Sequence, residues 1–139
     1  MKKLLLLFSL LLSFNALGEW EQMTKDTKGS SYYLQLDKIK THNNYIYFWY
    51  LKNNPKPVEW YETLNDIPWL FLSQSFYLEV DCGINRYKVL SNTGYTGPMA
   101  SGEIVQINDP APKWSYFPPN SAGESVLETA CIVAPLVND

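Results

Sequence analysis

The sequence predicts an α+β domain: an antiparallel β-sheet of about six strands, with a C-terminal α-helix packed on one face and joined to it by a disulfide. Short runs of β-branched, aromatic and apolar residues recur along the chain, with turn residues between them. A helical spacing of apolar residues follows near the C-terminus. The two cysteines are divided between these two kinds of segment, which predicts that a bridge joins sheet and helix.

The first 18 residues have the pattern of a secretory signal peptide. Lys2 and Lys3 precede the apolar run Leu4–Leu12, and the small residues Ala16 and Gly18 stand before the expected cut. The run is shorter than the roughly 20 residues of a membrane span, which disfavours the alternative of an uncleaved anchor. No cysteine follows the cut, so surface attachment as a lipoprotein is not supported. We expect an exported protein, periplasmic or secreted, with no membrane insertion after cleavage.

Residues 19–139 are expected to form a single domain of 139 − 18 = 121 residues. Without Lys2 and Lys3, 9 basic residues face 14 acidic ones, so the formal charge is 9 − 14 = −5. Nucleic acids and anionic membranes are bound by basic surfaces, so this charge argues against both as partners. Nothing in the sequence predicts a cofactor.

The expected strands follow one another with turns between them. Alternation is clearest in Ser75–Cys82, where Phe76, Leu78, Val80 and Cys82 share one face. Residues 52–68 contain three prolines, and we expect a long loop there. A helical turn is expected at Asp37–Ile39 and a chain turn at Thr41–Asn44. The expected strands are Trp20–Met23, Tyr32–Leu34, Tyr45–Leu51, Ser75–Cys82, Arg86–Ser91 and Glu103–Ile107.

The helix is predicted from a capping pattern and an apolar stripe. Ser121 and Glu124 stand in the S-x-x-E arrangement that opens helices. Beyond them, Val126/Ala130 and Leu127/Cys131 are i,i+4 pairs on one side. In an exported protein, Cys82 and Cys131 therefore predict a structural disulfide. A bridge closing a loop of about 50 residues stabilises a domain by about 4 kcal/mol.

The stretch GYTGPMASGE, residues 94–103, is rich in glycine, as many phosphate-binding loops are. A phosphate loop is followed by a helix and usually contains a lysine. Here a strand is expected to follow, and no lysine lies between Lys88 and Lys113. We therefore expect turn and bulge positions that link two strands.

Candidate catalytic groups are few, and we do not expect an enzyme. His42 is the only histidine, and it lies far from any serine-bearing motif, so the sequence contains no recognisable catalytic triad. Cys and His residues are too few for a zinc site. Glu79 and Asp81 share one strand face and could act as acid and base, but Arg86 and Lys88 on the next strand are expected to pair with them.

Aromatic residues are the stronger signal, because Trp, Tyr and Phe make up 15% of the chain. In the strand 45–51 both faces are apolar or aromatic, so the face away from the helix needs a cover. Either the loop 52–72 folds back with Trp60 and Trp69 to cover it, or the face binds a partner or ligand. The candidate binding residues are Tyr45, Tyr47, Trp49, Trp60, Tyr61 and Trp69.

Several stretches together resemble the surface-adhesin protein E family of Gram-negative bacteria. The resemblance covers nearly all of residues 19–139. It implies an antiparallel sheet with a disulfide-linked C-terminal helix, non-catalytic binding of host extracellular-matrix proteins, and homodimers formed through the sheet. The segment around Pro55–Leu72 is richer in Trp and Pro than the family pattern. The matching stretches are Trp20, YYLQLDKIK (32–40), NYIYFWYL (44–51), YLEVDCGINRYKVLS (77–91), YTGPMASGE (95–103), Trp114 and PPNSAGESVLETAC (118–131).

Two other functions remain open from the sequence. One is a periplasmic structural or accessory protein whose aromatic face only forms a homodimer. The other is an envelope protein that binds carbohydrate, because sugar-binding platforms use the same aromatic residues as protein interfaces.

Overall fold

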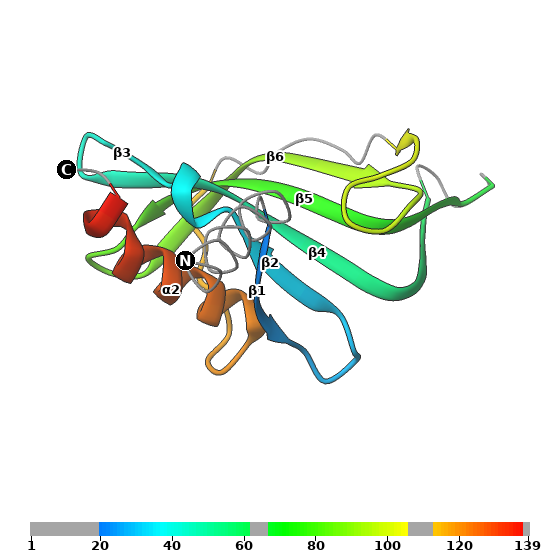
Figure 1. Cartoon of the computed structure of the whole chain (residues 1–139), viewed down its shortest axis with the longest axis horizontal. Helices are drawn as coiled ribbons and strands as arrows, with labels where there is room; N and C mark the ends of the chain where they lie inside the picture. Colours follow the sequence, from blue (N-terminus) through cyan, green and yellow to red (C-terminus); the bar gives the residue numbers. More distant parts are fainter. Residues whose placement is uncertain (1–19, 62–66, 106–112, 138–139) are drawn as a thin grey trace, which may run out of the picture.

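A computed structural model of the chain describes residues 20–61, 67–105 and 113–137; the expected signal peptide lies outside them. Figure 1 shows one twisted sheet with a single long helix at one end. The predicted fold class is confirmed, with seven strands rather than about six. The elements are β1 (Glu21–Lys25), β2 (Ser31–Leu34), the 3₁₀ turn η1 (Leu36–Lys38), β3 (Lys40–His42), β4 (Tyr45–Trp60), β5 (Trp69–Asp81), β6 (Arg86–Tyr95), β7 (Ile104–Val105) and α2 (Ala122–Val137).

The strands are antiparallel neighbours in the order β1-β2-β4-β5-β6-β7, and β3 pairs with the first residues of β4. The β3–β4 hairpin turns at Asn43 and Asn44, whose φ angles are 50° and 68°. Asparagine tolerates this left-handed backbone, which a tight two-residue hairpin needs. Thr41 and His42, expected in the turn, instead pair with Ile46 and Tyr45.

The core lies between α2 and one face of the sheet, here called the inner face. Val126, Leu127 and Ala130 of α2 are buried, as the apolar stripe predicted, and Ala134 one turn later is buried as well. They cluster with strand residues that alternate along β4 and β5: Ile46, Phe48, Tyr50, Leu78 and Val80. The predicted bridge between Cys82 and Cys131 is present and ties the end of β5 to the helix.

The start of α2 follows the predicted capping pattern with one difference. Glu124 N–H donates to Ser121 Oγ at 3.2 Å, as expected. The Glu124 carboxylate, however, accepts from the N–H of Asn120 rather than from that of Ser121. Asn120 takes the left-handed conformation, with φ of 62°, which turns its N–H toward the helix. Two donors near the helix start are thereby satisfied.

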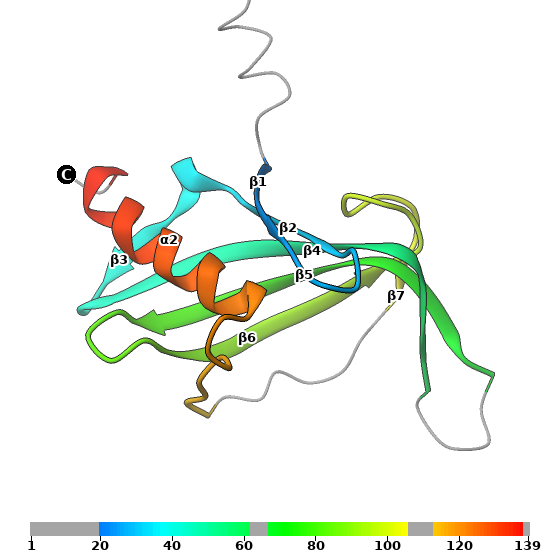
Figure 2. The same ribbon diagram turned by 90° about the horizontal axis from the view of Figure 1, so that it is seen from below.

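The prediction of a loop at residues 52–68 is wrong over most of that range. β4 continues to Trp60 and β5 begins at Trp69, so the strands form one long hairpin that projects past the helix-covered body (Figure 2). Between the paired residues Asn53 and Val58 lie four residues, whereas only Leu72 lies between their partners Ser73 and Phe71. This bulge contains Pro55 and Pro57. Proline is tolerated there because β2 pairs with β4 only as far as Asn53, so the missing N–H costs no ladder bond.

The last strands also differ from the expected ranges. β6 reaches Tyr95, four residues beyond the expected end at Ser91, because its residues 92–95 pair with the extended β5. β7 covers Ile104 and Val105 only, and the rest of the strand expected at Glu103–Ile107 lies outside the described residues.

Candidate functional site

The outer face of the sheet, opposite α2, holds the first half of the predicted aromatic set. Tyr45, Tyr47 and Trp49 are half-buried and alternate with the buried residues of the inner face. Tyr77 of β5 packs beside them, with ring centroids 4.8 Å from Trp49 and 6.4 Å from Tyr47. Together they form an aromatic shelf along β4 and β5.

Trp114 covers one end of this shelf. Its ring lies 5.3 Å from the ring of Tyr45, and it is held in place by the bridge between Tyr87 and Ser115. The guanidinium of Arg86 and the ammonium of Lys88 lie 4.3 and 4.5 Å from the Trp114 ring centroid. Cation–π contacts of this kind keep an indole fixed against a strand. The shelf is therefore partly covered by a segment that precedes the helix.

The carboxylates on this face are paired, as the sequence predicted. Asp81 contacts Arg86 at 3.1 Å, and Glu79 contacts Lys88 at 3.6 Å. Glu79 also accepts a hydrogen bond from the Tyr47 hydroxyl, which raises the pKa of Tyr47 to about 12. Both carboxylates thus have structural partners, and these contacts join neighbouring strands on the outer face.

The glycine-rich stretch covers the other end of the outer face. Ser73 is fully buried; its Oγ donates to Gly97 O at 2.7 Å and accepts from Ala100 N–H at 2.9 Å. Asn53 Oδ1 accepts from Met99 N–H at 2.8 Å. The stretch joins β6 to β7, as predicted. Its position over the outer face of the sheet was not predicted. The signal that could have found it is the small polar pair Ser73 and Ser75 on a face that needs burying.

The second half of the predicted set lies at the far end of the β4–β5 hairpin. Trp60 pairs with Trp69, so the segment does not fold back over the shelf as one alternative required. Trp69 and Leu70 are each 51% exposed, and Ile67 is 88% exposed. We call the apolar side chains at this end of the hairpin, which lie on both faces of the ribbon, the distal patch; they are Val58, Trp60, Tyr61, Ile67, Trp69 and Leu70.

The distal part of the hairpin has no further strand beside it. Among the described residues, β2 pairs with β4 no farther than Asn53, and β6 pairs with β5 no farther than Ser73. The backbone from Val58 to Trp60, and from Trp69 to Phe71, therefore has one unpaired edge on each side of a two-stranded ribbon. Such edges readily accept another strand.

The other candidate residues do not come together as a catalytic or metal site in the described part of the chain. His42 is exposed, and in the described part of the chain its ring hydrogen-bonds to the side-chain amide of the neighbouring Asn43. Within residues 20–61, 67–105 and 113–137, no three His, Cys, Asp or Glu side chains are placed to hold a metal ion. None of the helices in the described part is both long and apolar enough to cross a bilayer.

A model of the family described as surface-adhesin protein E matches residues 20–132. The chain belongs to the surface-adhesin protein E family. The fold is similar to that of Haemophilus influenzae protein E, with a TM-score of 0.61 and 14% identity over 82% of this chain and 84% of that one. A second crystal form of that protein gives 0.62 at 14% identity, covering 82% and 87%. A comparison with curated protein sequences returns no match.

Membership of this family makes the chain an adhesin-like module and implies that it is exported. The family points to a non-enzymatic adhesin rather than to an enzyme. The likeness to Haemophilus influenzae protein E concerns the fold, because identity at 14% is low.

Proposed function

We propose that this chain is an exported, non-catalytic binding module that recognises a protein partner through the distal patch. The observation that carries the proposal is the exposure of Trp69, Leu70 and Ile67 on a ribbon with two unpaired edges. Aromatic residues dominate the binding energy of protein interfaces. Unpaired strand edges add main-chain hydrogen bonds that only another polypeptide can supply in register.

The partner class follows from the family. A surface adhesin meets proteins of the host, so we propose an extracellular-matrix protein as the partner. The bulge at residues 54–57 fits this role, because it separates the ribbon from the covered sheet and presents it as a projecting arm. Tyr61 donates to Glu59 at 2.7 Å, which holds one aromatic side chain of the arm in place before binding.

The test is binding of purified residues 19–139 to immobilised extracellular-matrix proteins, measured by surface plasmon resonance. We expect Trp69→Ala to weaken binding at least tenfold, because truncating an anchor residue of an interface costs about 2 kcal/mol or more of binding free energy. Ile132→Ser is the matched control, because Ile132 is 70% exposed on α2, away from the hairpin. Equal binding by Trp69→Ala and the unaltered chain would contradict the proposed surface.

Export is the second part of the proposal, and we infer that residues 1–18 are removed during it. Intact-mass measurement of the protein recovered from cells should show an N-terminus at Glu19. Cell fractionation then separates the periplasm from the cell surface and the medium. Confinement to the periplasm would rule out host adhesion and leave an accessory role in the envelope.

A carbohydrate-binding role is the alternative that one observation favours. A cavity of about 340 Å³ lies on the shelf, between Trp49, Tyr77, Lys38 and Lys40. Aromatic faces beside polar groups are also the means by which proteins hold sugars. A glycan array on residues 19–139 decides this question. Hits that Trp49→Ala abolishes would favour this alternative over the distal patch, and an empty array leaves protein binding ahead.

A further inference from the structure

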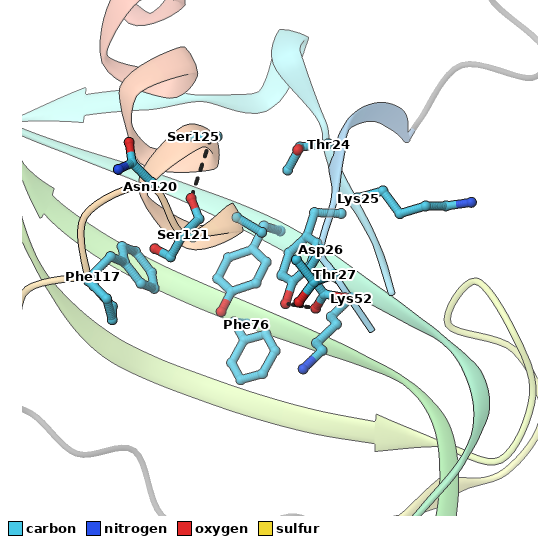
Figure 3. Close-up of a pocket in the computed structure, with 15 residues that line it drawn as sticks. Thr24, Lys25, Asp26, Thr27, Lys52, Phe76, Phe117, Asn120, Ser121 and Ser125 are labelled. Atoms are coloured by element: carbon cyan, nitrogen blue, oxygen red, sulfur yellow. Dashed lines mark hydrogen bonds between the residues drawn. The ribbon is translucent and has the colours of Figure 1, made fainter. Parts of the chain in front are cut away.

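A second cavity lies on the inner face, where α2 begins and leaves part of the sheet uncovered. Its volume is about 480 Å³, within the range of small-molecule sites. Figure 3 shows Phe117 and Ser121 of the helix start on one side, the Thr24–Thr27 segment on the other, and Phe76 beside Lys52 below them. Three parts of the chain that are distant in sequence therefore meet around one hollow.

The walls of the cavity are aromatic and flat. The ring of Tyr50 stacks on Phe76 with centroids 4.6 Å apart and planes inclined by 14°. Tyr32 stacks on the other side of Tyr50 at 6.3 Å. Phe117 is fixed because it packs where the Cβ of residue 123 would be, and only glycine fits there. The cavity is thus preformed and suited to a planar apolar group.

The Tyr50 hydroxyl in this cavity has no protein partner among the described residues. Tyr50 is only 7% exposed, and its hydroxyl makes no hydrogen bond within the described residues. In the same residues, no fully shielded side-chain oxygen or nitrogen lacks a partner. The Tyr50 hydroxyl must therefore open onto the cavity that it lines. Burial raises the pKa of Tyr50, so the hydroxyl stays protonated and can donate.

One positively charged side chain, that of Lys52, lies at the cavity. Lys52 lies beside Phe76 in Figure 3, whereas Lys25 extends away from the cavity. The start of α2 contributes the positive end of the helix dipole, although Glu124 N–H is already bonded to Ser121 Oγ and the Glu124 carboxylate lies at the same end. Asp26 is the one acidic side chain of the lining, and it accepts bonds from Ser30 N–H, Lys28 N–H and the Tyr32 hydroxyl. The charge of Asp26 is therefore compensated by these donors, and it also interacts with the charge of Lys52.

We propose that this cavity binds a small planar aromatic carboxylate. The aromatic body lies between Phe76, Tyr50 and Phe117, and the carboxylate accepts a hydrogen bond from the Tyr50 hydroxyl near Lys52 and the helix start. The Tyr50 hydroxyl adds an observation that is independent of the helix end: it is a donor on a largely buried ring that faces the cavity without a protein partner in the described residues. This site lies on the helix-covered face, so it is independent of the distal patch.

The test uses 2-naphthoate as the probe and residues 19–139 as the protein, with affinity from calorimetry and location from amide chemical shifts. We expect shifts at residues 121–123 and around Tyr50 and Phe76. The uncharged isostere 2-naphthamide should bind about tenfold more weakly, because a charge-assisted hydrogen bond is lost. Inorganic phosphate is the second probe, and it should bind much more weakly because it has no aromatic body.

Two variants test the assigned groups. Tyr50→Phe removes only an unpartnered hydroxyl, so we expect an unchanged thermal midpoint and about tenfold weaker naphthoate binding. Lys52→Met keeps the aliphatic stem and should weaken binding about threefold, with less dependence on salt. Tyr116→Phe and Lys56→Met are the matched controls, because both residues are exposed and neither lines the cavity.

Several results would overturn the proposal: no naphthoate binding at millimolar concentration, equal binding of the amide, or wild-type affinity in both variants. Phosphate binding as tight as that of naphthoate would assign the helix end to anions in general, and the proposed ligand class would be wrong. None of these results bears on the hairpin, so failure here is distinguishable from failure of the proposed function.

Discussion

The two ends of the β4–β5 hairpin are made of similar residues but have opposite surroundings. At the first end, Phe48 and Leu78 pair across the strands and are almost fully buried beneath α2. At the far end, Trp60 and Trp69 pair in the same way, yet Trp69 is 51% exposed. Strand pairing is common to both ends. The difference is that helix, disulfide and neighbouring strands surround only the first.

This comparison shows that apolar and aromatic side chains make a core only where another element covers them. The cover at the first end comes from residues far along the chain, Val126 to Ala134. At the far end the chain provides no such element in its described part, and the bulge at residues 54–57 sets the ribbon apart. An uncovered aromatic ribbon of this kind is suited to binding rather than to stability.

The largest expected effect comes from cutting the link between helix and sheet. The double variant Cys82→Ala/Cys131→Ala should lose about 4 kcal/mol of unfolding free energy, because the bridge closes a long loop in the unfolded chain. Denaturant unfolding measures this loss. The distal patch should still bind its partner in variant molecules that remain folded. An unchanged midpoint would mean that packing alone holds α2 on the sheet.

The same substitution at two leucines of β5 tests whether the two ends of the hairpin differ in burial. Leu78 is fully buried, whereas Leu70 is 51% exposed. Leu78→Ala should cost about 3 kcal/mol through lost burial and a residual cavity. Leu70→Ala should change stability by less than about 0.5 kcal/mol. Thermal and denaturant unfolding of both variants provide the measurement, and similar losses would show that the far end is covered in solution.

Ser73 tests the cover on the outer face. Ser73→Ala removes the partner of Gly97 O and of Ala100 N–H, and leaves two backbone groups with lost hydrogen bonds. We expect a loss of about 2 kcal/mol, measured by denaturant unfolding. Ser91→Ala on β6 is the control. The Ser91 side chain makes no hydrogen bond within residues 20–61, 67–105 and 113–137, so this substitution should be nearly neutral. A neutral Ser73→Ala would mean that the glycine-rich stretch does not depend on this anchor.

Much of the covered end was predictable from local patterns. Alternation in Ser75–Cys82 and the i,i+4 stripe around Leu127 and Cys131 placed both cysteines toward one interface, where the disulfide is found. These signals depend on periods of two and about four residues, which a sequence shows directly. The fold class followed from them.

The far end of the hairpin and the segments that cover the sheet were not predictable in the same way. Pro55 and Pro57 suggested a loop, because proline is excluded from central strands, but an edge strand tolerates it. Whether a strand is central or at an edge depends on where β2 ends, which is a property of the whole sheet. The bonds of Ser73 to Gly97 and Ala100 join residues more than 20 positions apart. The cavity beside Tyr50 likewise needs three distant segments together.

The smallest expected effect concerns the β1–β2 turn, which borders the covered end. Burial opposes ionisation of Asp26, but hydrogen bonds from Ser30, Tyr32 and Lys28 outweigh it and hold the pKa of Asp26 below its ordinary value of 3.8. A lowered folded pKa contributes stability above the unfolded pKa, and this stability is lost as the pH falls through the folded pKa. Asp26→Asn should therefore cost about 1 kcal/mol at pH 7 and less in strong acid.

Glu59 at the far end is the matched comparison for Asp26. Its carboxylate accepts one hydrogen bond, from Tyr61, on an exposed ribbon. Glu59→Gln should change the free energy of unfolding by less than about 0.5 kcal/mol, since a single hydrogen bond on an exposed ribbon adds little in water. Denaturant unfolding at pH 7 measures both variants, and repeating it in acid for Asp26→Asn tests the acid dependence of that group. If Asp26→Asn and Glu59→Gln cost the same, the turn would be no better ordered than the hairpin tip, and the contrast between the two ends would not extend to their charges.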